Sequence, residues 1–282
     1  MSLGPLPLVL VLLAAMMHAG WNFLAKAGDD RLVALAVIKG PSTLVALGIL
    51  LFTGLPARES WPLLAASVTV NCLYFYFLIR AYRGDLSLAY PISRGLAPLL
   101  VLALSMLVAH EVPSPIGLFG VLLISGGILV LALRREPSRQ HLETLMWAGA
   151  VALMIAAYTV IDGLGARRAG TSAGYVAALS ALTGVAVCGI AWQRRGGARL
   201  LQAVRAGWLR GLVGGLLMLF AYVFVVHAMT LAPMAQVSAL RESSVIFAAL
   251  LGVIVLKEPF GRERVLASAL VAAGIVLMAS GR

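Results

Sequence analysis

Ten stretches of about 20 mostly apolar residues follow one another along this chain, and they set the strongest limit on its fold. Hydrophobic residues make up 61% of the 282 residues and charged residues only 12%, about half the charged fraction of a soluble domain. A stretch of this length crosses a bilayer as a helix. The sequence therefore predicts an all-α membrane protein with ten transmembrane helices. The predicted spans cover residues 5–26, 32–53, 61–82, 86–109, 114–133, 145–163, 171–192, 208–230, 233–256 and 264–280.

The two halves of the chain repeat each other at a constant offset. Residues 87–131 align without a gap on a later segment, so that Arg94 matches Arg241, Glu111 matches Glu258 and Gly127 matches Gly274. We expect a first five-helix repeat over residues 1–136 and a second over residues 137–282. Because five is odd, the repeats enter the membrane in opposite directions. Such inverted repeats are typical of secondary transporters, whose site lies in a central cavity between the halves.

We explain the net charge of +11 by the distribution of basic residues among the loops between spans, and we expect no nucleic-acid partner. Basic residues near the membrane accumulate on the cytoplasmic side. The loops after the odd-numbered spans contain Lys26, Arg31, Arg80, Arg83, Arg134, Arg135, Arg139, Arg194, Arg195, Arg199, Arg205, Arg210, Lys257, Arg262 and Arg264, and the opposite side contains only Arg58, Arg167, Arg168 and Arg282. This asymmetry predicts that both termini are non-cytoplasmic. The residues before the first span lack a basic signal-peptide start, so we expect that helix to be retained.

Three basic residues lie deep in the predicted spans, away from the span ends: Lys39, Arg94 and Arg241. Arg241 and its neighbour Glu242 are about 10 Å deep in the ninth span, where charged residues are expensive and usually functional. A guanidinium group suits bidentate recognition of a carboxylate or phosphate. The alternative is that Arg94 and Arg241 pair with acids such as Glu242 and Asp162 to lock helices together. Lys39 either lines the cavity or extends to the interface.

Further polar residues in the spans complete the candidate substrate site. In the first span, His18, Trp21 and Asn22 share one helix face. The remaining candidates are Asn71, Tyr74, Tyr90, Tyr158, Tyr222, His227, Gln236 and Ser238. For each residue of both groups, the alternative is packing or a hydrogen bond between helices.

The acidic residues divide into two groups. Glu242 and Asp162 lie deep in spans, and we take them as candidates for proton coupling. Glu111 and Glu258 lie where one span ends and the next begins, so we expect a structural role at the positive end of the following helix.

No pattern for catalysis, a metal or ATP stands out. HExxH, Gly-x-Ser-x-Gly and phosphate-loop motifs are not found, and Cys72 and Cys188 are single cysteines within apolar spans. We expect no catalytic residues, no metal, no cofactor and no enzyme activity, with transport driven by a gradient.

Four segments carry a family resemblance: HAGWNFLAK from His18, LAYPISRG from Leu88, HEVPSPIGLFGVLLISGGILVL from His110 and KEPFGRERVLASALVAAGIVLM from Lys257. With them the chain resembles the ten-helix members of the drug/metabolite transporter superfamily, which contain two EamA-type domains. The resemblance implies a secondary carrier that often exports amino acids or related metabolites. Other branches carry sugar phosphates or nucleotide sugars, and the opening motif is similar to that of bacterial proteins sometimes linked with phosphonate use.

Together these observations predict a transporter in the bacterial inner membrane that works by alternating access. We expect it to export an amino acid or a related anionic or zwitterionic metabolite. One alternative is a carrier of an organic phosphate, a phosphonate or a nucleotide-sugar-like anion, and another is an intramembrane enzyme acting on a lipid-linked substrate. The expected partners are the small-molecule substrate and the lipid bilayer, with the protein either a monomer or a homodimer.

Overall fold

The computed structural model describes residues 3–25, 30–81, 86–130, 139–256 and 262–280, and the regular structure of this part is helical. The helices and one 3-10 turn are α1 (Pro5–Ala25), α2 (Arg31–Thr53), η1 (Arg58–Ser60), α3 (Trp61–Ala81), α4 (Leu86–Val108), α5 (Pro115–Val130), α6 (Arg139–Arg168), α7 (Ser172–Arg195), α8 (Gly197–Leu231), α9 (Met234–Arg241), α10 (Ser244–Leu256) and α11 (Arg262–Ser280).

The ten predicted spans correspond to helices, with two differences. The ninth span is broken into α9 and α10, and the predicted loop over residues 194–207 is wrong because α8 begins at Gly197. Within the described residues, seven helices are long and apolar enough to cross a membrane, and two shorter apolar helices cover residues 115–130 and 265–280. The predicted all-helical membrane architecture is therefore confirmed.

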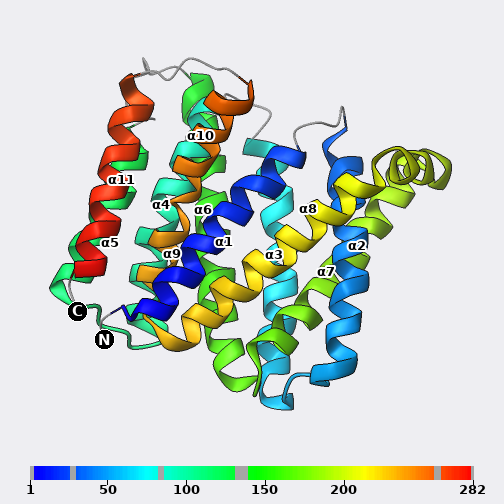
Figure 1. The fold of residues 1–282 in the computed structure, drawn as a ribbon, viewed down its shortest axis with the longest axis horizontal. Helices are drawn as coiled ribbons and strands as arrows, with labels where there is room; N and C mark the ends of the chain where they lie inside the picture. Colours follow the sequence, from blue (N-terminus) through cyan, green and yellow to red (C-terminus); the bar gives the residue numbers. More distant parts are fainter. Residues whose placement is uncertain (1–2, 26–29, 82–85, 131–138, 257–261, 281–282) are drawn as a thin grey trace.

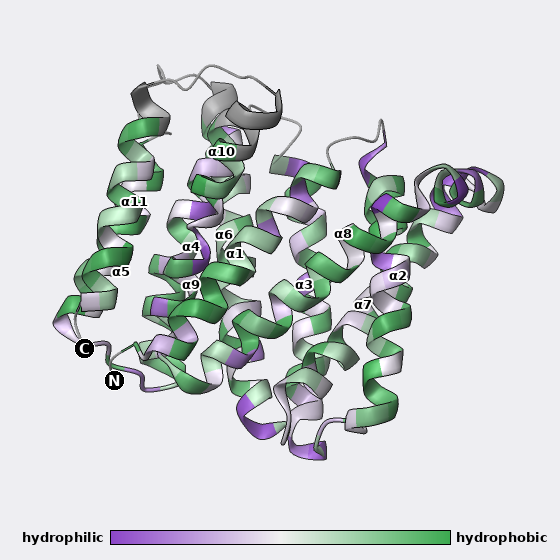
Figure 2. Ribbon diagram, in the orientation of Figure 1, coloured by the Kyte–Doolittle hydropathy of each residue, from purple (hydrophilic) through white to green (hydrophobic). Residues whose placement is uncertain are grey.

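Large apolar side chains cover much of the outer surface. Phe52 is 93% exposed and Leu51 is 87% exposed, and Figure 2 shows hydrophobic residues along most of the helices. An apolar surface of this extent is stable only against lipid. The chain is an integral membrane protein with several spans.

The helices pack in a pattern that pairs the two halves (Figure 1). Helix α1 packs on α8 as α3 packs on α6, while α2 contacts α7 and α5 contacts α11. The chain ends marked N and C lie at the same end of the bundle in Figure 1. This end is called the N/C end below, and the other the far end.

Glycines allow two of these helices to approach closely. A Cβ atom on Gly211 would lie 2.5 Å from the carbonyl oxygen of Val37, and one on Gly215 would lie 2.6 Å from that of Ile38. Both glycines therefore let α8 contact the backbone of α2. Small residues at such spacing are the usual device for helix association in membranes.

Candidate functional site

The chain is interrupted inside the ninth span, directly after Arg241. Helix α9 ends there, and α10 begins at Ser244. The turn is tight: the Glu242 amide donates to the Ala239 carbonyl at 3.0 Å, and the Ser243 amide donates to the Leu240 carbonyl at 3.0 Å. Such 3-10 geometry within a longer helix often marks a functional hinge. It places Arg241 and Glu242 at the break.

Two arginines meet one glutamate at this break. Nε of Arg94 on α4 lies 2.7 Å from Oε2 of Glu242, and Nη2 of Arg241 lies 3.7 Å from Oε1 of Glu242. All three are buried: Glu242 is 0% exposed, Arg241 4% and Arg94 8%. We call these three residues the arginine cluster. With both arginines and the glutamate ionised, it carries a net charge of about +1, because an arginine does not lose its proton in proteins.

The polar atoms of the arginine cluster are not fully hydrogen-bonded. Nε and Nη2 of both arginines and both Glu242 oxygens have no hydrogen-bond partner within the described part of the chain. The close approach of Arg94 to Glu242 is thus an ion pair without hydrogen-bond alignment. Buried charged groups in this condition are costly, and native proteins normally satisfy them. The cluster is therefore chemically suited to bind a polar ligand.

Several aromatic candidates from the sequence lie near the cluster. Tyr74 on α3 and Tyr158 on α6 pack edge to face, with ring centroids 5.9 Å apart, and both, like Tyr90 and His18, lie within electrostatic range of Arg94. These residues come from α1, α3, α4 and α6. The structure thus brings together side chains from both halves of the chain around one charged centre.

The three polar residues of α1 bond mainly to one another. Nε1 of Trp21 donates to Nδ1 of His18 at 3.3 Å, and Nδ2 of Asn22 donates to the His18 carbonyl oxygen at 2.8 Å. The predicted shared face is present. His18 is the member that approaches the arginine cluster.

Asp162 forms a second buried polar centre on α6. Its side chain is fully buried; the Tyr175 hydroxyl donates to Oδ1 at 3.0 Å, and the Tyr222 hydroxyl donates to Oδ2. Ser67 on α3 also lies close to this carboxylate.

Lys39 and His227 lie in contacts between other helices. Nζ of Lys39 on α2 donates to Oγ1 of Thr183 on α7 at 3.2 Å, and Nδ1 of His227 on α8 lies 3.0 Å from Oγ of Ser172 on α7. Each is a hydrogen bond between helices. For His227 this is the alternative interpretation given above, whereas for Lys39 the sequence had predicted either a place in the cavity or an extension to the interface.

The remaining candidates divide between helix bonds and close packing. Nδ2 of Asn71 donates to the Ser67 carbonyl oxygen in its own helix at 2.9 Å. Nε2 of Gln236 lies 2.0 Å from the position that a Cβ atom on Gly117 would take, so it contacts α5. Ser238 is buried, and its hydroxyl has no hydrogen-bond partner among the described residues.

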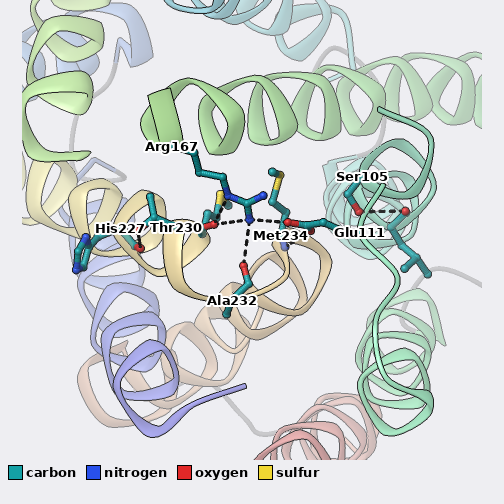
Figure 3. A network of polar contacts seen from close by, with 9 residues as sticks. Ser105, Glu111, Arg167, His227, Thr230, Ala232 and Met234 are labelled. Atoms are coloured by element: carbon teal, nitrogen blue, oxygen red, sulfur yellow. Dashed lines mark hydrogen bonds and ion pairs between the residues drawn. The ribbon is translucent and has the colours of Figure 1, made fainter. Parts of the chain in front are cut away.

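Glu111 joins three parts of the chain at the N/C end of the bundle (Figure 3). Its Oε1 accepts from Nη2 of Arg167 at 2.5 Å, and its Oε2 accepts from the Met234 amide at 2.8 Å. Arg167 also donates to the Met229 carbonyl oxygen, from Nη2 at 2.6 Å and from Nε at 3.0 Å. We call this set the Glu111 network. It ties the end of α6 to the turn between α8 and α9.

The Glu111 side chain faces the N-terminus of α9. The sequence analysis had instead expected it at the N-terminus of the following helix, which is α5. The reason is the backbone at His110, whose φ of 54° turns the chain after α4. The Glu111 amide then donates to the Ser105 carbonyl at 3.1 Å, a Schellman-type ending. The start of α5 is capped by Ser114, whose Oγ accepts from the Gly117 amide at 3.1 Å. Its repeat counterpart, Glu258, lies outside the described residues.

Sequence reasoning missed two residues that these sites use. Tyr175 was not singled out, although it is fully buried and bonds to Asp162. Arg167 was counted only as a loop charge. A tyrosine in an apolar span 13 positions after a deep aspartate is a weak signal that the sequence did contain; no comparable signal marked Arg167.

The described residues offer no evident metal centre. Within them, no group of three or more histidine, cysteine, aspartate or glutamate side chains gathers closely enough to hold a metal ion. Cys72 and Cys188 are free thiols.

Comparisons with known proteins show the fold and a family match over the second half of the chain. Residues 142–280 match the model of the EamA-like transporter family. A protein crystal structure among 29 matching chains covers 97% of this chain and 98% of its own, with a TM-score of 0.75 and 16% identity. At that identity the likeness shows the fold alone. No curated protein sequence matches this chain.

Proposed function

We propose that this chain, whose residues 142–280 match the EamA-like transporter family, is a secondary transporter of a small anionic or zwitterionic metabolite. Family membership makes it a membrane transporter and leaves the substrate open. We infer an amino acid or a related acid, exported by alternating access and driven by a gradient.

The observation that carries this proposal is the arginine cluster. Arg94 and Arg241 are buried beside a single carboxylate, and their guanidinium groups retain unused donors within the described chain. Arg241 is the more available of the two because its closest approach to Glu242 is 3.7 Å, against 2.7 Å for Arg94. A substrate carboxylate or phosphate bound to Arg241 would gain charge-assisted hydrogen bonds in a dry environment.

Glu242 favours a zwitterion within that class. Its two oxygens have no hydrogen-bond partner in the described residues, so they are available to accept from an ammonium group. A substrate carboxylate on Arg241 and an ammonium group on Glu242 would neutralise both ends of an amino acid. A phosphorylated or phosphonate substrate would instead place more negative charge beside the Glu242 carboxylate. The resulting repulsion makes such a substrate less favourable than an amino acid.

The helix arrangement supports alternating access between two inverted halves. When the two halves are exchanged, α1 corresponds to α6, α2 to α7 and α3 to α8. The contact of α1 with α8 then becomes that of α6 with α3, and the contact of α2 with α7 is unchanged, as the structure shows for all three pairs. Arg94 and Arg241 stand at equivalent positions of the sequence repeat and meet at one carboxylate. A site where the two repeats meet, beside a discontinuous helix, is the usual transporter design.

Glu242 is our first candidate for proton coupling, and Asp162 is the second. Protonation of Glu242 would free both arginines for an anion, whereas a charged Glu242 holds Arg94. Asp162 accepts hydrogen bonds on both oxygens from Tyr175 and Tyr222, so its protonation would rearrange contacts among α6, α7 and α8.

Counterflow in proteoliposomes tests the proposed function. Vesicles loaded with one unlabelled metabolite should take up the labelled form of the same metabolite, and the recovered label should be chemically unchanged. We expect amino acids or related acids to give counterflow, and Arg241→Lys to reduce it, with Arg58→Gln at an exposed position as the control. Counterflow only with organic phosphates or nucleotide sugars would shift the substrate class. Chemical conversion of a lipid-linked substrate without counterflow would reject transport.

A further inference from the structure

The first turns of α8 lie across the bundle end instead of along its helices. Gly207, with φ −125° and ψ 24°, breaks the helical path inside α8. Figure 1 shows residues before this kink end-on at the upper right, at the far end of the bundle. We call residues 197–206 the surface helix. Its direction is that of a helix lying in the plane of a membrane surface.

The surface helix exposes an apolar face. Leu201 is 50% exposed, Val204 38% and, just after the kink, Trp208 61%. Leu201 and Val204, three residues apart, lie on one side of the surface helix, and Trp208 follows directly after the kink. Apolar residues together with a tryptophan at the end of a bundle are typical of the region where lipid headgroups meet acyl chains.

Positive charge is concentrated on the same segment. Arg199 and Arg205 lie on the surface helix, Arg194 precedes it and Arg210 follows it, and residues 194–210 contain no aspartate or glutamate. All four arginines are exposed. One acid from α2, Asp30, pairs with Arg195 at 2.5 Å and approaches Arg199 at 3.8 Å. The segment therefore keeps a strong excess of positive charge.

A pocket of about 410 Å³ lies between the surface helix and the ends of α1 and α2. Val33, Val37 and Ile38 give it apolar walls, Arg199 and Arg210 contribute guanidinium groups to its lining, and Asp30 contributes a carboxylate. This mixture matches a phospholipid, which has a charged phosphate beside an acyl chain. A soluble anion would have no use for the apolar walls.

We propose that the surface helix and this pocket bind an acidic phospholipid of the leaflet at the far end of the bundle. The lipid phosphate contacts Arg199 and Arg210, its acyl chain lies along Val33 and Val37, and the surrounding acidic headgroups face the other arginines. The charge of the segment selects acidic over zwitterionic lipid, because basic residues close to a membrane are attracted to a negative surface. This inference is independent of the transported substrate.

Quenching of Trp208 by brominated lipids tests the proposal. The full-length protein is placed in nanodiscs, and the Trp208 signal is taken as the difference between wild type and Trp208→Phe. We expect brominated phosphatidylglycerol to quench this signal at a mole fraction at least about fivefold lower than brominated phosphatidylcholine does. Arg199→Gln combined with Arg205→Gln should remove most of this preference, since each basic residue near the surface contributes about fivefold.

Arg58→Gln is the matched control, since Arg58 is an exposed arginine next to a tryptophan, Trp61, at the N/C end of the bundle. It should leave the Trp208 preference unchanged. Equal quenching by the two lipids overturns the proposal, as does a preference that survives in the double variant or is lost equally in the control. An absence of quenching by either lipid would show that the surface helix does not lie at the membrane interface.

Discussion

Loss of the Arg167 side chain should destabilise the protein strongly through the Glu111 network. The Glu111 side chain is only 8% exposed and the Arg167 side chain 31%, so Arg167→Gln leaves a buried carboxylate without its charge partner. Removing one partner of a buried pair costs about 3–5 kcal/mol. We take the lower end, about 3 kcal/mol, because water reaches part of Arg167 and weakens the pair.

The two hydrogen bonds to the Met229 carbonyl disappear in the same variant. A net charged hydrogen bond contributes about 1.5–3 kcal/mol, so the loss of about 3 kcal/mol is a lower bound. For a chain of this size, a loss of about 3 kcal/mol corresponds to a fall in Tm of roughly 6–12 °C.

Thermal unfolding of the purified protein in detergent measures this effect. Arg168→Gln is the matched control, because Arg168 is the exposed neighbour in the same helical turn. A double-mutant cycle of Arg167→Gln with Glu111→Gln should give a coupling free energy of about 1–3 kcal/mol. Equal Tm values for Arg167→Gln and Arg168→Gln, or additive effects in the cycle, would refute the reasoning.

Three further predictions concern pH and topology. Burial works to raise the pKa of Asp30, but hydrogen bonds from Arg195 and from the Val33 and Leu32 amides hold that pKa below its usual value. Asp30→Asn should therefore lower Tm at pH 7, and the difference from wild type should begin to shrink below pH about 4 and disappear as the pH falls through the lowered pKa of Asp30. An unchanged difference at pH 3 would contradict this. Glu242→Gln should alter the pH dependence of transport, and a profile identical to that of wild type would remove Glu242 as the coupling residue. A C-terminal reporter that fluoresces only in the cytoplasm should stay dark, whereas a bright fusion would reverse the predicted orientation.

The architecture could be predicted from the sequence because membrane spans carry a strong local signal. Backbone groups in lipid must bond within a helix, so apolar length alone indicates each span. The break after Arg241 could not be predicted in this way, since Met234 to Leu256 form a continuous run of suitable length. The surface helix was missed as well. Its arginines made residues 194–207 resemble a polar loop, although the segment from Gly197 is helical.

The site was only partly predictable, because burial depth is easier to infer than partners. Depth and the repeat indicated Arg94, Arg241 and Glu242 together. The sequence analysis gave pairing of the arginines with Glu242 only as an alternative; the structure shows Glu242 2.7 Å from Arg94 and 3.7 Å from Arg241. The partner of Glu111 depends on how α6 meets the turn before α9, which no local pattern encodes.

Ligand binding to lysine variants of the arginine cluster tests the central claim most directly. A thermal-shift screen of amino acids, organic acids and phosphorylated metabolites first identifies a stabilising ligand, and its Kd is then measured for wild type, Arg94→Lys and Arg241→Lys. Lysine keeps the charge but loses the planar fork. We predict that both variants keep an unliganded Tm close to that of wild type and that at least one binds tenfold or more weakly, about 1.4 kcal/mol. Normal binding by both variants, or failure of both to fold, would show that these arginines lock helices and do not recognise the substrate.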